Sequence, residues 1–193
     1  ANSYSQAFEW IVTVYRRLGQ VLTERGHEGI LIGDEGGYGP KLRTNEEAIE
    51  LVVAAIEAAG LKPGSNVAVG LDVASTHFFE DDRYRLPSVS ASSLTAEQMV
   101  DLLDDWVTRY PIISLEDPLA EDDWTGWQLL TQKLGRKIQL VGDDLYATNV
   151  ERLSQGIKLK ASNSILIKPN QIGTLTETIA AMQMAQLAGW TTV

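Results

Sequence analysis

The 193-residue sequence contains no cysteine, only two histidines and no long apolar run. The absence of cysteine excludes disulfides and thiolate metal sites. No apolar stretch reaches the roughly 18 residues that a membrane-spanning helix needs, so we expect no membrane segment. Residues 1–9 lack the basic start and the apolar core of a signal peptide. Nothing therefore suggests export, and we expect a cytoplasmic protein.

Basic residues are also scarce. The chain has 16 lysines and arginines against 26 acidic residues, which gives a formal net charge of −10. A field of this sign repels phosphate backbones, so we expect no nucleic-acid partner. A small anionic metabolite would be repelled as well, unless a bound cation or a few lysines reversed the local potential. If this protein acts on a phosphorylated acid, a metal ion is expected at its site.

What the sequence does contain is a regular alternation of strand-like and helical segments. Short apolar strands are expected at 29–33, 67–71, 111–115, 138–142, 163–167 and 190–193. Helices are expected between them, two of them opened by capping boxes at Thr44 with Glu47 and at Thr95 with Gln98. The polar stretch 76–93 interrupts this order, and we expect an exposed hairpin or loop at 80–83.

The strand-like segments predict the type of sheet. A continuous apolar run such as 111–115 is typical of a strand that is buried on both faces. Repeated strand–helix units of this kind imply a parallel sheet with helices outside it. A closed eight-stranded barrel and an open doubly wound sheet both fit this pattern. The chain has no linker, low-complexity stretch or internal repeat, which predicts one domain.

Charged residues stand at the carboxyl ends of the expected strands. Asp72, Glu116 and Asp143 each follow an apolar strand directly, and Lys168 closes another. Glu35 follows the first expected strand by two residues. The spacings from residue 35 to 72, 116, 143 and 168 are 37, 44, 27 and 25 residues. Most of them are close to the length of one strand–helix unit, about 30 residues.

This placement predicts a metal site. A single acid after a strand usually caps a helix or a turn. In a barrel, however, the carboxyl ends of the strands meet on one face, where the active site lies. Several carboxylates gathered there would repel each other, and a divalent cation relieves that repulsion. Ligation by oxygen alone selects a hard ion, so we expect Mg²⁺, with Mn²⁺ as the alternative.

Lys168 also has two interpretations. A lysine at a strand end usually points into solvent. Beside a divalent cation in a partly closed pocket, its charged form would be disfavoured and its pKa lowered. It could then serve as a general base near neutral pH.

Five segments, in order along the chain, resemble enolases. They are GDEGGYGP at 33–40, GLDVAS at 70–75, SLEDPLAEDDW at 114–124, VGDDL at 141–145 and IKPNQIGTL at 167–175. The resemblance implies an α/β TIM-type (β/α)8 barrel that is incomplete here, with about five to six strand–helix units. Residues 1–193 would be part of the C-terminal barrel domain, with the amino-terminal lid domain and the last barrel units absent. We then expect little turnover from these residues alone, and a homodimer or larger assembly for the full-length protein.

The resemblance also implies a reaction and a role for each residue. The reaction would be the Mg²⁺-dependent, reversible dehydration of 2-phosphoglycerate to phosphoenolpyruvate in glycolysis and gluconeogenesis, a lyase activity. Asp72, Glu116 and Asp143 would bind Mg²⁺. Lys168 would be the proton acceptor and Glu35 the proton donor. Glu116, Asp143 and Lys168 would contact the substrate.

Two other readings stay open. The chain could belong to an enzyme of the wider enolase superfamily that abstracts a proton next to a different carboxylate. It could also be a non-catalytic scaffold that keeps the fold. The five segments and their filled chemical positions favour enolase itself. His27 and His77 are expected to be structural.

Overall fold

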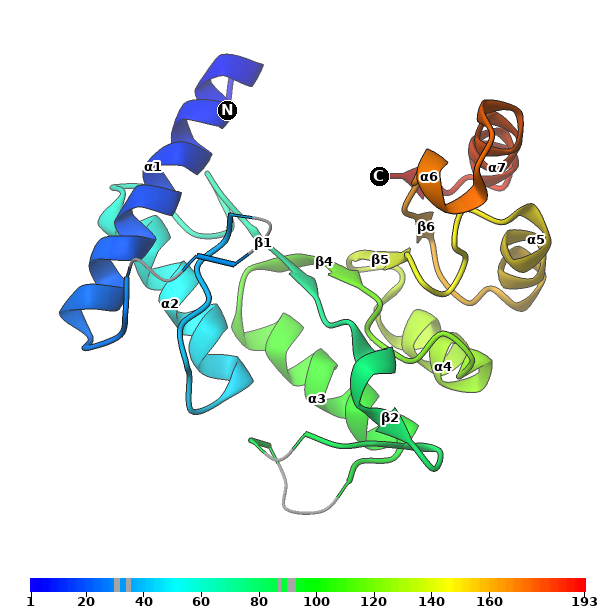
Figure 1. Ribbon diagram of the computed structural model, residues 1–193, viewed down its shortest axis with the longest axis horizontal. Coiled ribbons are helices and arrows are strands. Elements are labelled where there is room, and N and C mark those ends of the chain that lie inside the picture. The colour runs from blue at the N-terminus through cyan, green and yellow to red at the C-terminus, as the bar shows by residue number, and fades with distance from the viewer. Residues whose placement is uncertain (30–31, 34–35, 87, 90–92) are drawn as a thin grey trace. The chain divides into compact units, whose positions relative to one another are not determined.

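The computed structural model describes residues 1–193 except 30–31, 34–35, 87 and 90–92 (Figure 1). It comprises two compact units, Ala1–Val69 and Gly70–Val193, which are described separately. Among the helices of the described residues, none combines the length and apolar character needed to cross a membrane.

The first unit is built on two helices, α1 (Tyr4–Glu24) and α2 (Asn45–Ala58). The capping box predicted at the start of α2 is formed in part: the Thr44 side chain accepts from the backbone N–H of Glu47, but the Glu47 carboxylate accepts from the backbone N–H of Arg43, one residue before the N-cap. The core between the helices is apolar and includes Val21, Leu22 and Leu51. The strand predicted at 29–33 includes residues 30–31, which lie outside the described residues.

The second unit contains a parallel sheet whose strands follow the order β1-β4-β5-β6-β7. The strands are β1 (Val69–Asp72), β4 (Ile112–Glu116), β5 (Gln139–Gly142), β6 (Ser164–Ile165) and β7 (Thr191–Thr192). The register pairs Glu116 with Val141 and Gly142 with Ile165. Their carboxyl ends therefore meet at one edge of the sheet.

Helices alternate with these strands, as the sequence predicted. They are α3 (Ala96–Arg109), α4 (Trp124–Leu134), α5 (Val150–Leu159), the single turn α6 (Pro169–Ile172) and α7 (Leu175–Leu187). Figure 1 shows α3, α4 and α5 on one side of the strands that they connect. Strand–helix repetition around a parallel sheet confirms the predicted α/β barrel architecture, of which the described residues form a part.

The polar stretch after β1 forms the predicted hairpin. The short helix η1 (Ser75–Phe78) leads into β2 (Phe79–Glu80), which pairs antiparallel with β3 (Arg83–Tyr84). The Tyr84 side chain is fully buried, and its hydroxyl donates to Asp123 Oδ2 at 2.6 Å and accepts from the backbone N–H of Ala120 at 3.1 Å. One phenol thus anchors the hairpin to the segment that precedes α4.

Tyr146 organises the packing beneath the carboxyl end of β5. Its ring fills the space that a side chain would need at Gly142 and at Gly156, because a Cβ at either position would lie 2.5 Å from a Tyr146 atom. Its hydroxyl is 2.7 Å from Ser162 Oγ. Glycine at residue 142, directly before Asp143, is therefore a packing requirement.

Candidate active site

Three acidic side chains stand at the carboxyl ends of neighbouring strands. Asp72 and Glu116 are the last residues of β1 and β4, and Asp143 follows β5 directly. Because β1, β4 and β5 are consecutive in the sheet, the three backbone positions lie side by side at one edge. This is the arrangement in which barrel enzymes place reactive groups.

Lys168 reaches the same edge from the next strand. It is the N-cap residue of α6, and its Nζ donates to Asp143 Oδ2 at 2.5 Å. The second oxygen of Asp143 accepts from Gln171 Nε2 at 3.0 Å. Asp143 is 8% exposed and both of its carboxylate oxygens have a donor, while Lys168 is half-buried and Gln171 is exposed. A charge-assisted hydrogen bond in such surroundings fixes the lysine amine in the site.

The electrostatic balance of the edge is negative. The pKa of Glu116 is raised to about 7, mainly by burial and in addition by the charges of Asp72, Asp143 and Asp117, against the opposing effect of Lys168. Burial also raises the pKa of Asp72, with a smaller contribution from Asp143. The one nearby lysine does not compensate for these acids. A bound metal cation with oxygen ligands would do so.

The pKa of Lys168 is raised above its ordinary value. The main cause is the hydrogen bond to Asp143, and the charges of Asp143 and Glu116 add to it. The carboxylate beside the amine stabilises the ammonium form. The lower pKa expected beside a divalent cation stays a prediction.

A second acidic cluster was not predicted. Within the part of the chain that the structure describes, the carboxylates of Asp117, Asp143 and Asp144 form a set whose oxygens come within 4.8 Å of one another; Asp72 and Glu116 do not belong to it. Proximity alone would make Asp117 a metal ligand. Its hydrogen bonds argue otherwise, because Oδ1 accepts from the backbone N–H of Asp143 at 3.0 Å and Oδ2 from that of Asp144 at 2.9 Å.

Asp117 therefore acts as a junction between strand ends. Besides its two side-chain bonds, its backbone N–H donates to Val141 O, and its carbonyl accepts from the N–H of Ser75. The residue is 4% exposed and has a φ of 37°, in the left-handed region. The ends of β1, β4 and β5 are joined through this one residue. The sequence held a signal for it, an acid directly after the strand-end Glu116, but the same signal suits any turn.

We expect Asp117→Ala to lower the free energy of unfolding by about 2–4 kcal/mol, because it leaves two backbone N–H groups without their acceptor. Chemical denaturation monitored by circular dichroism measures this loss. The matched control is Glu57→Ala at an exposed position of α2, where we expect a change within about 0.5 kcal/mol. Equal stabilities of the two variants would contradict the junction role.

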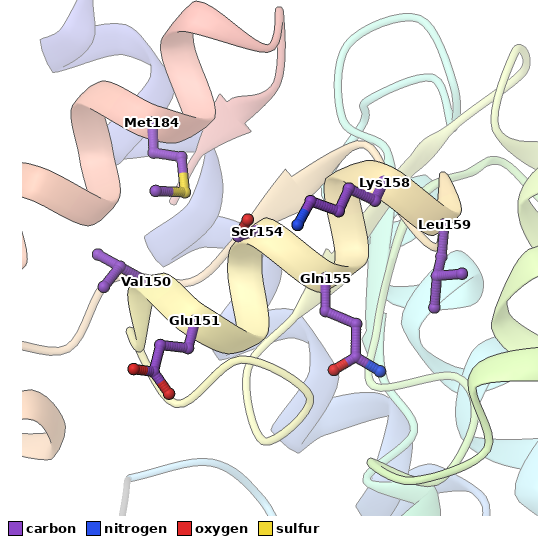
Figure 2. A pocket seen from close by; sticks show the side chains of 7 residues that line it. All are labelled: Val150, Glu151, Ser154, Gln155, Lys158, Leu159 and Met184. Carbon is purple, nitrogen blue, oxygen red and sulfur yellow. The ribbon is translucent and has the colours of Figure 1, made fainter.

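Glu35, the predicted proton donor, lies outside the described residues. His27 is 3.5 Å from Glu47 within the first unit, an ion-pair distance that suits its expected structural role. A groove between α5 and α7 contains none of the predicted site residues (Figure 2). It is lined by Val150, Glu151, Ser154, Gln155, Lys158, Leu159 and Met184.

Comparison with known families agrees with this architecture. The family model described as "Enolase, C-terminal TIM barrel domain" matches residues 1–193, the whole chain. The chain therefore belongs to the enolase C-terminal barrel family. Membership supports an enolase-like function in general terms, in an enzyme of the enolase superfamily.

Proposed function

We propose that this enolase-family chain carries the Mg²⁺-dependent, reversible dehydration of 2-phosphoglycerate to phosphoenolpyruvate. The observation that carries the proposal is the contact between Lys168 Nζ and Asp143 Oδ2 at an edge that also bears Asp72 and Glu116. A potential base and a set of hard oxygen ligands are together there. Removal of a proton next to a carboxylate needs both.

In this proposal Asp72, Glu116 and Asp143 hold Mg²⁺. When bound, the ion supplies electrostatic stabilisation of the negative charge that develops on the substrate carboxylate. The buried backbone around Asp117 keeps two of these three ligands at adjacent strand ends. Glu116 and Asp143 also lie beside the substrate, as does Lys168.

Lys168 is proposed to take the proton from the carbon next to the substrate carboxylate, through the lone pair of its neutral Nζ. Its hydrogen bond to Asp143 keeps the amine in place while favouring the ammonium form. Any interaction that draws the Asp143 charge away from the amine shifts Lys168 towards the basic form. Glu35 is proposed to donate a proton to the departing hydroxyl, because hydroxide is a poor leaving group without an acid.

The direct test is a steady-state assay of the full-length protein with 2-phosphoglycerate, following the ultraviolet absorbance of the enol phosphate. We expect turnover that requires Mg²⁺, that a chelator abolishes and that added Mg²⁺ restores. A panel of other carboxylates with an acidic neighbouring C–H bond is run in parallel. Turnover of one of these alone would assign the chain to another branch of the superfamily. Mg²⁺ binding without any turnover would indicate a non-catalytic scaffold.

The raised pKa of Glu116 predicts how Mg²⁺ binding depends on pH. Because the folded protein holds this proton up to about pH 7, the metal must displace it at lower pH. We expect the affinity to fall by up to about tenfold per pH unit below pH 7 and to level off above it. Calorimetry in buffers with different ionisation enthalpies should show about one proton released per ion at pH 6 and few at pH 8. A flat affinity between these values would contradict the assignment of Glu116.

A further inference from the structure

Thr148 has an unusual backbone for its residue type. With Ala147 it forms a pair of consecutive non-glycine residues at positive φ, 45° and 56°. The left-handed region is unfavourable for a β-branched residue. Thr148 is also fully buried. A strained conformation of this kind persists only where the surroundings require it, and such residues concentrate at functional sites.

The strained pair ends a tight turn that begins at Asp143. The carbonyl of Asp143 accepts from the backbone N–H groups of Tyr146 at 3.1 Å and Ala147 at 2.7 Å. The Asn149 N–H donates to Tyr146 O at 2.7 Å, and the Asn149 side chain then caps α5. Thr148 is therefore held at a defined place relative to the carboxylate of Asp143.

The hydroxyl of Thr148 makes hydrogen bonds to the segment that follows β6. Its Oγ1 accepts from the backbone N–H of Lys168 at 2.9 Å. As a donor it lies 3.4 Å from both Leu166 O and Gln171 Oε1, so it can turn to either. A single side chain in the loop after β5 thus contacts the segment from Leu166 to Gln171.

The hydrogen bonds among Thr148, Lys168, Asp143 and Gln171 form a closed ring. Lys168 Nζ donates to one oxygen of Asp143, and Gln171 Nε2 donates to the other. Thr148 contacts the backbone of Lys168 and the side-chain amide of Gln171. The lysine amine is consequently positioned from two sides, by the carboxylate at its tip and by the hydroxyl at its backbone.

We propose that Thr148 is a positioning residue for Lys168, and that its hydroxyl sets where the amine lies relative to the substrate carbon. The proposal rests on the proposed function, in which Lys168 is the base. Displacement of a reacting group by about 1 Å can cost about 100-fold in rate. The strained backbone at Thr148 follows from this requirement, because it directs Oγ1 at the Lys168 N–H.

Two matched pairs of residues isolate the hydroxyl in the full-length protein. Thr148→Val has nearly the same shape as threonine without the hydroxyl, and Thr148→Ser differs from Thr148→Ala by the hydroxyl alone. We expect kcat to fall about 10- to 100-fold for Val and Ala and to recover to within about threefold for Ser. The KM for 2-phosphoglycerate and the Kd for Mg²⁺ should change by less than about threefold. If valine prevents folding, the Ser–Ala pair carries the same comparison.

A second measurement does not depend on activity. Loss of the acceptor should increase hydrogen exchange of the Lys168 backbone amide by about tenfold or more in Thr148→Val or Thr148→Ala, while neighbouring amides in α5 keep their protection. A slowed kcat together with a larger isotope effect from deuterium on the reacting carbon would place the defect in proton removal. The inference is overturned if the Lys168 amide stays protected, or if kcat and Mg²⁺ affinity fall and KM rises together with a loss of stability. Lack of turnover in the unmodified protein would instead reject the proposed function, and the amide exchange would still test the contact.

Discussion

Lys168→Met is expected to lower turnover of 2-phosphoglycerate by about 10²- to 10⁴-fold, the range that a positioned general base contributes. Methionine keeps an unbranched side chain of similar length but has no basic nitrogen. Nothing else in the described part of the site offers an amine at Asp143 Oδ2. Steady-state kinetics at saturating Mg²⁺ measure the loss in kcat, and exchange of the reacting proton with deuterated solvent should slow in parallel.

A measurement of Mg²⁺ affinity distinguishes the loss of the base in Lys168→Met from a general collapse of the site. The ammonium group of Lys168 opposes a second cation. It also lowers the pKa of Asp72 and Glu116, but at alkaline pH, where these carboxylates are ionised with or without it, only the repulsion remains. We therefore expect Lys168→Met to bind Mg²⁺ at least as tightly as the unmodified protein. Lys158→Met makes the same change at an exposed position of α5 and should leave kcat within about twofold. Activity of Lys168→Met close to that of this control would reject Lys168 as the base.

Glu116→Gln is expected to raise the thermal stability of the metal-free protein and to reduce the stabilisation that Mg²⁺ provides. Without metal, the carboxylate of Glu116 is opposed by its burial and by the charges of Asp72, Asp143 and Asp117. Its pKa is raised on folding, so at pH values above about 7 its ionisation disfavours the folded state. Removal of the charge at pH 8 should therefore raise Tm, by about 2–4 °C for each kcal/mol recovered.

With metal, the same substitution removes a ligand. Mg²⁺ at about 100 times its Kd should stabilise the unmodified protein by about 2.7 kcal/mol, and Glu116→Gln should lose most of this gain. Thermal unfolding at pH 8 with and without Mg²⁺ gives both results in one experiment. Glu97→Gln is the matched control at an exposed position in the first turn of α3, where loss of the charge should slightly lower Tm and leave the Mg²⁺ response intact. A full Mg²⁺ response in Glu116→Gln would contradict the ligand assignment, and Asp72→Ala tests the neighbouring ligand in the same way.

Local signals in the sequence were sufficient for much of the fold. The Thr95–Gln98 capping box is formed in the structure, and Met99, Leu103 and Trp106 on the helix that it opens are buried. These features depend on residues within a few positions of each other, so periodicity and capping rules predict them. The strand predicted at 163–167 is shorter, Ser164–Ile165, although the Ile167 N–H still donates to Val193 O.

Contacts distant in sequence account for what the residue pattern did not predict. The direction of the Lys168 pKa depends on Asp143, which lies 25 residues away. Asp117 looks like any acid in a turn until its bonds to the N–H groups of Asp143 and Asp144 are known. Thr148 gave no signal, because neither its positive φ nor its contact with Lys168 can be deduced from residue type. The sequence placed Asp72, Glu116 and Asp143 at the carboxyl ends of their strands, but the contacts of Asp117 and Thr148 could not be deduced from it.

The junction at Asp117 divides two tasks between adjacent residues. In the proposed function Glu116 holds the metal ion, while Asp117 joins three strand ends by main-chain and carboxylate hydrogen bonds. The side chain at residue 116 can therefore be exchanged without loss of the hydrogen bonds that Asp117 makes. During evolution, proteins that keep Asp117 could therefore acquire new ligands or bases at their strand ends and remain folded after each substitution.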